Sequence, residues 1–133
     1  KTHPDPVLLD LAVCQALEQF GATLVVTAGY LKKVGVNTLS RFPGAVINVH
    51  PSLLPRHGGP GMYGLKVHQA VCDAGEVETG ATVHYVTEEY DQGQIIRQRK
   101  LDVLNDDNPE SLAARLLPVE HELLVNVLKE LSQ

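Results

Sequence analysis

Hydrophobic positions along the chain recur either at a period of three to four residues or in short, almost wholly apolar runs. Residues 5–19 follow the helical period, with Asp5 and Pro6 placed as an N-cap and a first helical residue. Residues 22–29 form a short apolar run that suits a strand covered on both faces. A short helix is predicted within residues 30–42. A helix that leads into a buried strand is half of a βαβ unit, so the pattern predicts an α/β fold.

The middle of the chain predicts a strand, a helix and a hairpin. Residues 45–50 are typical of a buried strand, and we expect parallel pairing with residues 22–29 because the connection crosses one face of the sheet. Residues 65–74 place apolar side chains on one helical side, with His68 on the polar side as a solvated histidine. Residues 79–103 hold two alternating runs around a short loop, which predicts an antiparallel hairpin at the sheet edge.

A long amphipathic segment ends the chain. Its N-cap is either Asp107 or Asn108, and leucines recur along one side of the predicted helix. Because Pro118 lies inside the segment, we expect the helix to kink there or to split in two. The elements together predict a largely parallel sheet flanked by helices, of Rossmann-like α/β type, with the hairpin and the C-terminal helix added to it.

Length and composition narrow the class of protein. The 133 residues, 44% of them apolar, suffice for one sizeable core, and we expect a single domain over residues 1–133. A net charge of -5 without a basic run gives nucleic acid no surface to bind. No apolar run approaches 18 residues, so we expect no membrane segment. Cys14 and Cys72 lie in apolar helical patterns, as expected of free thiols in a reducing cytoplasm.

Two polar side chains interrupt the apolar strand at residues 45–50. Asn48 and His50 alternate at the strand period, and Pro51 then forces the chain to leave the sheet. Ligands bind at the carboxyl ends of parallel strands, and a polar group at such an apolar tip is costly unless it is used or satisfied. The strand end is therefore a candidate functional site, with hydrogen bonds to neighbouring loops as the alternative explanation.

The residue types at this strand end suit chemistry at a carbonyl carbon. An amide and a protonated imidazole can together stabilise the oxyanion that develops there. Asp91, in the hairpin loop, is the nearest carboxylate, and we expect it to raise the pKa of His50. Ser52 lies in a proline-bounded loop without a nucleophile pattern, and neither cysteine has a histidine neighbour in sequence. Direct attack by a substrate group is therefore favoured over a covalent enzyme intermediate.

Phosphate and metal sites have weaker sequence signals. The glycine-rich residues 56–64 lack the Lys-Ser/Thr ending of a nucleotide-binding loop. Four side chains could gather around a metal: His50, His57, His84 and Asp91. Their spacings match no zinc pattern, so we expect no metal, and His84 is more simply a packed or orienting histidine.

Four segments in this order resemble the folate-dependent formyltransferases. They are residues 48–55 (Asn-Val-His-Pro-Ser-Leu-Leu-Pro), 58–64 (Gly-Gly-Pro-Gly-Met-Tyr-Gly), 80–86 (Gly-Ala-Thr-Val-His-Tyr-Val) and 91–96 (Asp-Gln-Gly-Gln-Ile-Ile). The resemblance covers almost the whole chain. The Gly-Met-Tyr-Gly loop resembles the branch that formylates glycinamide ribonucleotide in purine synthesis more than the branches acting on methionyl-tRNA or sugar nucleotides.

The resemblance implies a reaction and catalytic positions. The formyl donor would be 10-formyltetrahydrofolate, used as a co-substrate without a metal, and the acceptor would be the amine of glycinamide ribonucleotide. His50 would be the general acid and Asn48 would hold the oxyanion. Asp91 would raise the pKa of His50 and organise water for proton transfer.

The resemblance also implies binding positions. Those for the folate donor are Leu31, Lys32, Lys33, Val34, Asn48, Thr87, Glu88, Glu89, Tyr90 and Asp91. Glu120 would bind the ribose hydroxyls of the acceptor, and the Leu54–Pro55 peptide bond would be cis.

One part of the family pattern has no counterpart in residues 1–133. The first strand and the glycine-containing loop that receives the acceptor phosphate are not found, so we expect a catalytic domain that lacks its N-terminal part and exposes apolar surface along one sheet edge. A formyltetrahydrofolate hydrolase, with water as acceptor, and a non-catalytic folate-binding fragment stay open as alternatives. The expected partners are the two small-molecule substrates, with neither nucleic acid nor membrane, and a homodimer is left open.

Overall fold

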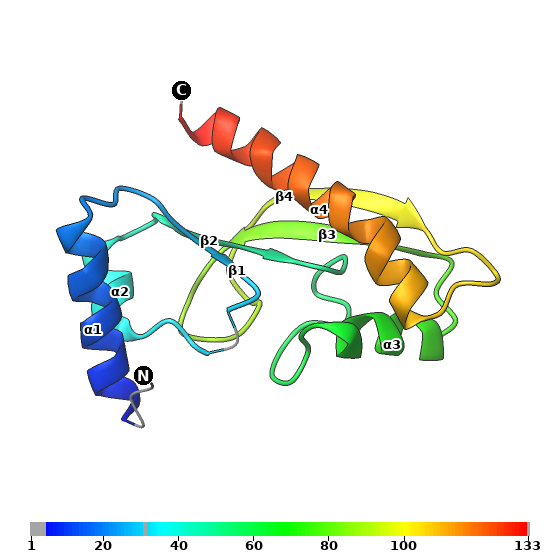
Figure 1. The fold of residues 1–133 in the computed structure, drawn as a ribbon, viewed down its shortest axis with the longest axis horizontal. Helices are drawn as coiled ribbons and strands as arrows, with labels where there is room; N and C mark the ends of the chain where they lie inside the picture. The colour runs from blue at the N-terminus through cyan, green and yellow to red at the C-terminus, as the bar shows by residue number, and fades with distance from the viewer. Residues whose placement is uncertain (1–4, 31, 133) are drawn as a thin grey trace.

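A computed structural model describes residues 5–30 and 32–132, which form one sheet with helices packed around it (Figure 1). The helices are α1 (Pro6–Gln19), α2 (Val36–Arg41), α3 (Leu65–Asp73) and α4 (Pro109–Leu131). The strands are β1 (Val25–Ala28), β2 (Val46–His50), β3 (Glu78–Tyr85) and β4 (Ile95–Asp102). None of the helices formed by these described residues is long and apolar enough to cross a membrane.

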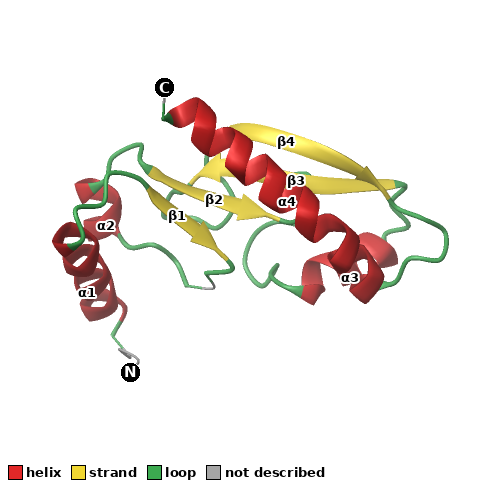
Figure 2. Ribbon diagram, turned by 45° about the horizontal axis from the view of Figure 1, so that its top comes forward, coloured by secondary structure: helices red, strands yellow, loops and turns green. Residues whose placement is uncertain are grey.

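The sheet has the strand order β1-β2-β3-β4 (Figure 2). The pairing of β1 with β2 is parallel, whereas β2 with β3 and β3 with β4 are antiparallel. The α/β fold and the hairpin predicted over residues 79–103 are confirmed. The sheet of the described residues is mixed, however, and the parallel arrangement that we expected to dominate occurs at one of its three strand pairs. The reason is that β3 runs back beside β2.

The core lies where α4 crosses the sheet. Its fully buried members come from β2, β3 and α4: Ile47, Ala81, Val83, Leu123 and Val127. Each fully buried Val, Leu or Ile side chain contributes on the order of 2 kcal/mol relative to an exposed one. This packing holds α4 across the sheet. It therefore sets the distance between α4 and the end of β2, where Asn48 and His50 lie.

The N-terminus of α4 is capped by Asn108 and not by Asp107. The Asn108 side chain accepts a hydrogen bond from the Ser111 backbone N–H at 2.8 Å, and the Ser111 hydroxyl accepts one from the Asn108 N–H at 3.0 Å. Of the two outcomes expected at Pro118, a kink or a split, the split is excluded, because α4 runs as one helix through this residue. Leu116 and Leu123 on either side of it are buried, so packing holds both halves of the helix on the protein.

The expectation that His68 is solvated is also wrong. Only 4% of this residue is exposed. His68 lies next to Val67 and three residues before Val71 on α3, and both valines are buried where α3 packs against α4. His68 is therefore on the side of α3 that packs against α4, and it is buried together with Val67 and Val71.

The edge of the sheet formed by β1 exposes apolar side chains. Val26 is 38% exposed there, and the neighbouring α1 exposes Val7 and Leu8. A buried carboxylate joins α1 to α2: Asp10 accepts hydrogen bonds from the Asn37 and Thr38 backbone N–H groups at 2.8 and 3.2 Å. The two helices are thereby held together beside β1.

Candidate active site

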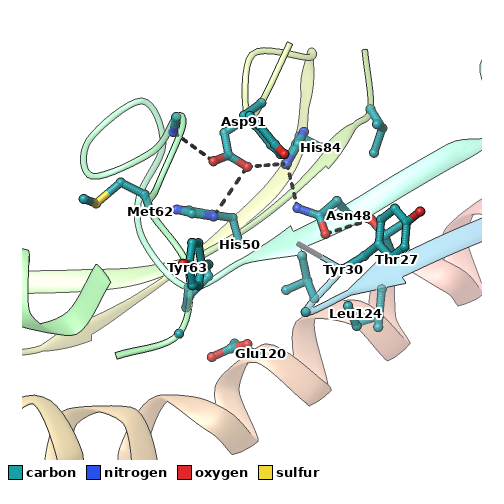
Figure 3. Close-up of a pocket in the computed structure, with 18 of the residues that line it drawn as sticks. Thr27, Tyr30, Asn48, His50, Met62, Tyr63, His84, Asp91, Glu120 and Leu124 are labelled. Atoms are coloured by element: carbon teal, nitrogen blue, oxygen red, sulfur yellow. Dashed lines mark hydrogen bonds and ion pairs between the residues drawn. The ribbon is translucent and has the colours of Figure 1, made fainter. Parts of the chain in front are cut away.

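The polar end of β2 opens into a cavity of about 930 Å³ (Figure 3). The ends of β1 and β2 form its floor, the loop after β2 and the hairpin loop form its sides, and α4 faces it. The Leu54–Pro55 peptide bond in the loop after β2 is cis, as the resemblance implied. The strand end predicted from sequence to be functional is therefore at a cavity.

Asn48 is held in one orientation by its neighbours. The Thr27 hydroxyl donates to Asn48 Oδ1 at 2.8 Å, so the amide nitrogen must point the other way. There Nδ2 lies 3.1 Å from His84 Nε2. His84 Nδ1 lies 2.9 Å from the Tyr85 carbonyl and donates to it, so the neutral ring offers a lone pair at Nε2 that accepts one Asn48 N–H. Within residues 5–30 and 32–132 nothing else accepts the second N–H of the Asn48 amide, so it is available to a ligand.

His50 lies between two acceptors and is 4% exposed. Its Nε2 donates to the His57 carbonyl at 3.0 Å, and its Nδ1 lies 3.5 Å from Asp91 Oδ1. Burial lowers the pKa of His50, and this outweighs the His57 carbonyl and the Asp91 charge, which both act to raise it. The prediction that Asp91 brings the pKa of His50 up toward neutrality is therefore wrong in its net direction, because the sequence does not reveal how deeply the ring is desolvated.

Asp91 is positioned by the glycine-rich loop as well as by its own turn. Its Oδ2 accepts the Gly59 backbone N–H at 2.9 Å. Its Oδ1 lies 3.6 Å from His84 Nε2, which is too long for a hydrogen bond, so we assign that nitrogen to Asn48. Burial alone would raise the pKa of Asp91, but the Gly59 N–H and the neighbouring His50 act against it, and the net direction of the pKa is downward. The carboxyl is thus ionised at neutral pH.

The two segments predicted to hold the folate donor lie next to each other at the cavity. The lining residues among them are Lys32, Lys33, Val34, Thr87, Glu89, Tyr90 and Asp91. Lys33 Nζ lies 3.6 Å from Glu89 Oε1 and 5.4 Å from the centre of the Tyr90 ring, which joins the two segments. Glu88 does not line this cavity and lies instead at a smaller pocket of about 270 Å³ beside α2. Leu31 lies outside the described residues.

Glu120 lines the cavity from α4, opposite the polar strand end (Figure 3). Burial raises the pKa of its carboxyl to about 7. Near neutral pH it therefore exists in both protonation states, and it can either donate or accept hydrogen bonds with hydroxyl groups.

Sequence reasoning missed several lining groups, among them Thr27, Met62, Tyr63 and His68. For Thr27 a signal existed: it is the neighbour of Asn48 in the parallel register of β1 and β2. The role of the Gly59 backbone N–H, which binds Asp91, could not be found from the sequence, because a pattern of side chains does not show which backbone groups reach a distant residue. Ser52 is not available as a nucleophile, because it is fully buried and its hydroxyl donates to the Arg56 carbonyl at 2.6 Å.

Residues 5–30 and 32–132 contain no group of three or more His, Cys, Asp or Glu side chains arranged to hold a metal ion. An oriented amide, a histidine and an ionised carboxylate instead face an open cavity. This set can polarise a carbonyl, stabilise an oxyanion and donate a proton, which are the needs of acyl-group transfer.

The fold and the site define a class of protein, and comparison with known families agrees. Residues 5–128 match the family described as formyl transferase, so the chain belongs to that family. It is 43% identical to the chloroplastic phosphoribosylglycinamide formyltransferase of Arabidopsis thaliana, over 96% of this chain and 44% of that relative. The chain thus spans less than half the length of this curated relative.

Solved structures agree with this assignment. The phosphoribosylglycinamide formyltransferase of Streptococcus pneumoniae TIGR4 superposes with a TM-score of 0.88 at 31% identity, covering 98% of this chain and 70% of that one. A formyltetrahydrofolate deformylase from Pseudomonas syringae superposes with a TM-score of 0.76, also at 31% identity, covering 87% of this chain and 37% of that one. Both a formyltransferase and a deformylase are thus represented among solved structures of this fold.

Proposed function

We propose that this chain carries the formyl-transfer site of a phosphoribosylglycinamide formyltransferase. The site would transfer a formyl group from 10-formyltetrahydrofolate to the amine of glycinamide ribonucleotide in purine synthesis. The observation that carries the proposal is the convergence of the Asn48 amide, the His50 ring and the Asp91 carboxylate on one cavity. Family membership and the names of the relatives support it.

In this proposal the acceptor amine attacks the formyl carbon directly. The carbonyl electrons move to oxygen, and the free N–H of Asn48 together with His50 stabilises the oxyanion, each such donor being worth about 3 kcal/mol. When the intermediate collapses, the bond from the formyl carbon to the folate nitrogen breaks. His50 gives its proton to that leaving nitrogen, and the proton lost by the attacking amine passes to water.

The lowered pKa of His50 is compatible with this role. A weakly held proton is a stronger acid, and an oxyanion that forms beside the ring favours the charged form at the moment it is needed. The distance of 3.5 Å from Nδ1 to Asp91 is longer than a good hydrogen bond. Because the neutral ring keeps its proton on Nε2 for the His57 carbonyl, the proton given to the leaving nitrogen would be the second one, taken up from water at Nδ1, and the ionised Asp91 would stabilise the imidazolium that carries it.

We assign the binding of the two substrates to opposite parts of the cavity. Its volume of about 930 Å³ is within the range typical of small-molecule sites. The segments joined by Lys33 and Glu89 would enclose the pterin of the donor. Glu120 on α4 would accept hydrogen bonds from the ribose hydroxyls of the acceptor. The free thiols of Cys14 and Cys72 support a reducing compartment such as the cytoplasm.

An assay of donor consumption with and without acceptor tests the proposal. We expect formyl transfer to glycinamide ribonucleotide by the wild type, and its loss in His50→Ala and Asp91→Asn. Glu122→Gln is the control for loss of a carboxylate charge outside the site, since Glu122 is 64% exposed, pairs with Arg99 and does not line the cavity. Transfer that survives in His50→Ala would contradict the assignment of roles.

The similarity to the Pseudomonas syringae deformylase makes hydrolysis the second candidate. Donor consumption at the same rate with and without glycinamide ribonucleotide would support water as the acceptor. Tight donor binding without turnover would instead support a non-catalytic folate-binding fragment.

A further inference from the structure

A carboxylate outside the cavity holds the loop that orients the catalytic pair. Glu76 lies between α3 and β3, and each of its oxygens reaches a different residue of the loop after β2. Its Oε2 accepts a hydrogen bond from His57 Nε2 at 2.8 Å, and its Oε1 lies 3.6 Å from Arg56 Nη1. Only 23% of the Glu76 side chain and 19% of the His57 side chain are exposed, so this contact is partly shielded from water.

The same short stretch of loop backbone contacts both members of the catalytic pair. The His57 carbonyl accepts the Nε2–H of His50 at 3.0 Å, and the Gly59 N–H donates to Asp91 Oδ2 at 2.9 Å. A shift of this stretch would therefore move the ring and the carboxylate relative to each other. The relative placement of His50 and Asp91 thus depends on what holds the stretch from His57 to Gly59.

Two features indicate that residues 57–59 are held in place by a contact from outside the loop. His57 has φ of 56°, a left-handed backbone that non-glycine residues adopt only where their surroundings hold them. The earlier part of the loop is fastened separately, since Leu54 N–H donates to the Thr82 hydroxyl at 3.1 Å and Gln98 donates to the Leu54 carbonyl at 3.0 Å. Beyond that point, the side chain of His57 is bound to Glu76.

We propose that Glu76 is a positioning residue for the His50 and Asp91 pair, acting through the side chain and backbone of His57. The kinetic part of this inference rests on the proposed formyl transfer, whereas its structural part does not. Removing the Glu76 carboxylate frees the His57 side chain, relaxes its left-handed backbone and loosens the carbonyl contact on His50 Nε2. Donor binding is left nearly unchanged, because neither Glu76 nor His57 lines the cavity.

The structural part is tested by the ring signals of the histidines in ¹⁵N-labelled protein. We expect Glu76→Ala to change the ring nitrogen signals of both His57 and His50, and Glu76→Gln to restore those of His50, since its amide oxygen still accepts from His57. Glu130→Ala is the control, because it breaks an exposed pair with Arg97 of the same 2.8 Å length away from the cavity. A changed His57 signal with an unchanged His50 signal in Glu76→Ala would overturn the inference.

The kinetic part is tested by the split between kcat and KM. We expect Glu76→Ala to lower kcat about tenfold or more while the donor KM stays within about threefold, as for a loss of catalytic alignment. Glu76→Gln should recover most of kcat. A kcat for Glu76→Ala within about twofold of wild type would overturn the inference. If Glu76→Ala does not fold, Glu76→Ser removes the same contacts with a residue common in turns.

The two proposals can fail separately. A wild type that transfers no formyl group refutes the proposed function, and the His50 ring signals then still decide whether Glu76 positions the ring. An active wild type whose Glu76→Ala variant has normal kcat and normal His50 signals refutes the positioning role alone.

Discussion

Glu120→Gln should remove a pH dependence of stability that the cavity imposes on the fold. Burial raises the pKa of Glu120 from its ordinary 4.5 to about 7. Between these two values the folded protein binds this proton more tightly than the unfolded chain, so folding stability falls as the pH rises through that window. Above the folded pKa the loss is complete. A shift of this size corresponds to roughly 2 to 3 kcal/mol, the lower figure allowing for the partial exposure of the side chain.

Urea unfolding of wild type, Glu120→Gln and the control Glu122→Gln at pH 5 and pH 8 measures this effect. Glutamine has the neutral carboxyl's shape without its ionisation, so Glu120→Gln should be close to wild type at pH 5. At pH 8 it should exceed wild type by roughly 2 kcal/mol in the free energy of unfolding. Glu122, which is 64% exposed, should give no such difference. An equal difference between Glu120→Gln and wild type at both pH values would refute the reasoning.

Three further perturbations have expected outcomes. Asp91→Asn removes a carboxylate charge 3.5 Å from His50 Nδ1 and should lower kcat at neutral pH about a hundredfold, measured by steady-state formyl transfer; an unchanged kcat would contradict its role. Gly93→Ala would place a Cβ inside the van der Waals radius of the Tyr85 carbonyl oxygen, so thermal melting should show a loss of about 2 kcal/mol or more; an unchanged melting temperature would contradict this. Asp10→Ala leaves the backbone N–H groups of Asn37 and Thr38 unpaired. The free energy of unfolding, measured in urea at neutral pH, should fall by about 2 kcal/mol. Hydrogen bonds to Asp10 lower its pKa against the effect of burial, so this cost should shrink as the pH falls through the range where Asp10 is protonated.

The position of the candidate site, a polar strand end at a cavity, could be predicted from the sequence because it depends on local pattern. A strand period in which Asn48 and His50 alternate, followed by Pro51, places two polar groups at a strand end in any arrangement of the sheet. The hairpin likewise follows from alternation and a short loop, and it brings Asp91 to the same cavity. Local chemistry also predicted Asp5 as the N-cap of α1, where its side chain accepts from the Val7 N–H at 2.8 Å.

The features that sequence reasoning missed depend on packing between distant segments. The pKa of His50 is lowered because the ring is desolvated, and His68 is buried because α3 packs on α4. The orientation of Asn48 depends on Thr27 from one strand and His84 from another, 21 and 36 residues away in sequence. No periodicity within a single element contains this information, so it becomes visible only in three dimensions.

The proposed formyl transfer depends most on the oriented amide of Asn48, which would stabilise the oxyanion formed at the formyl carbon. The most direct test is the kcat of formyl transfer by Asn48→Leu, which keeps the side-chain size but has no N–H to donate, together with the equilibrium affinity for the folate donor. We predict a fall in kcat of about a hundredfold or more with donor affinity within about threefold of wild type. A kcat close to that of wild type in Asn48→Leu would contradict the claim.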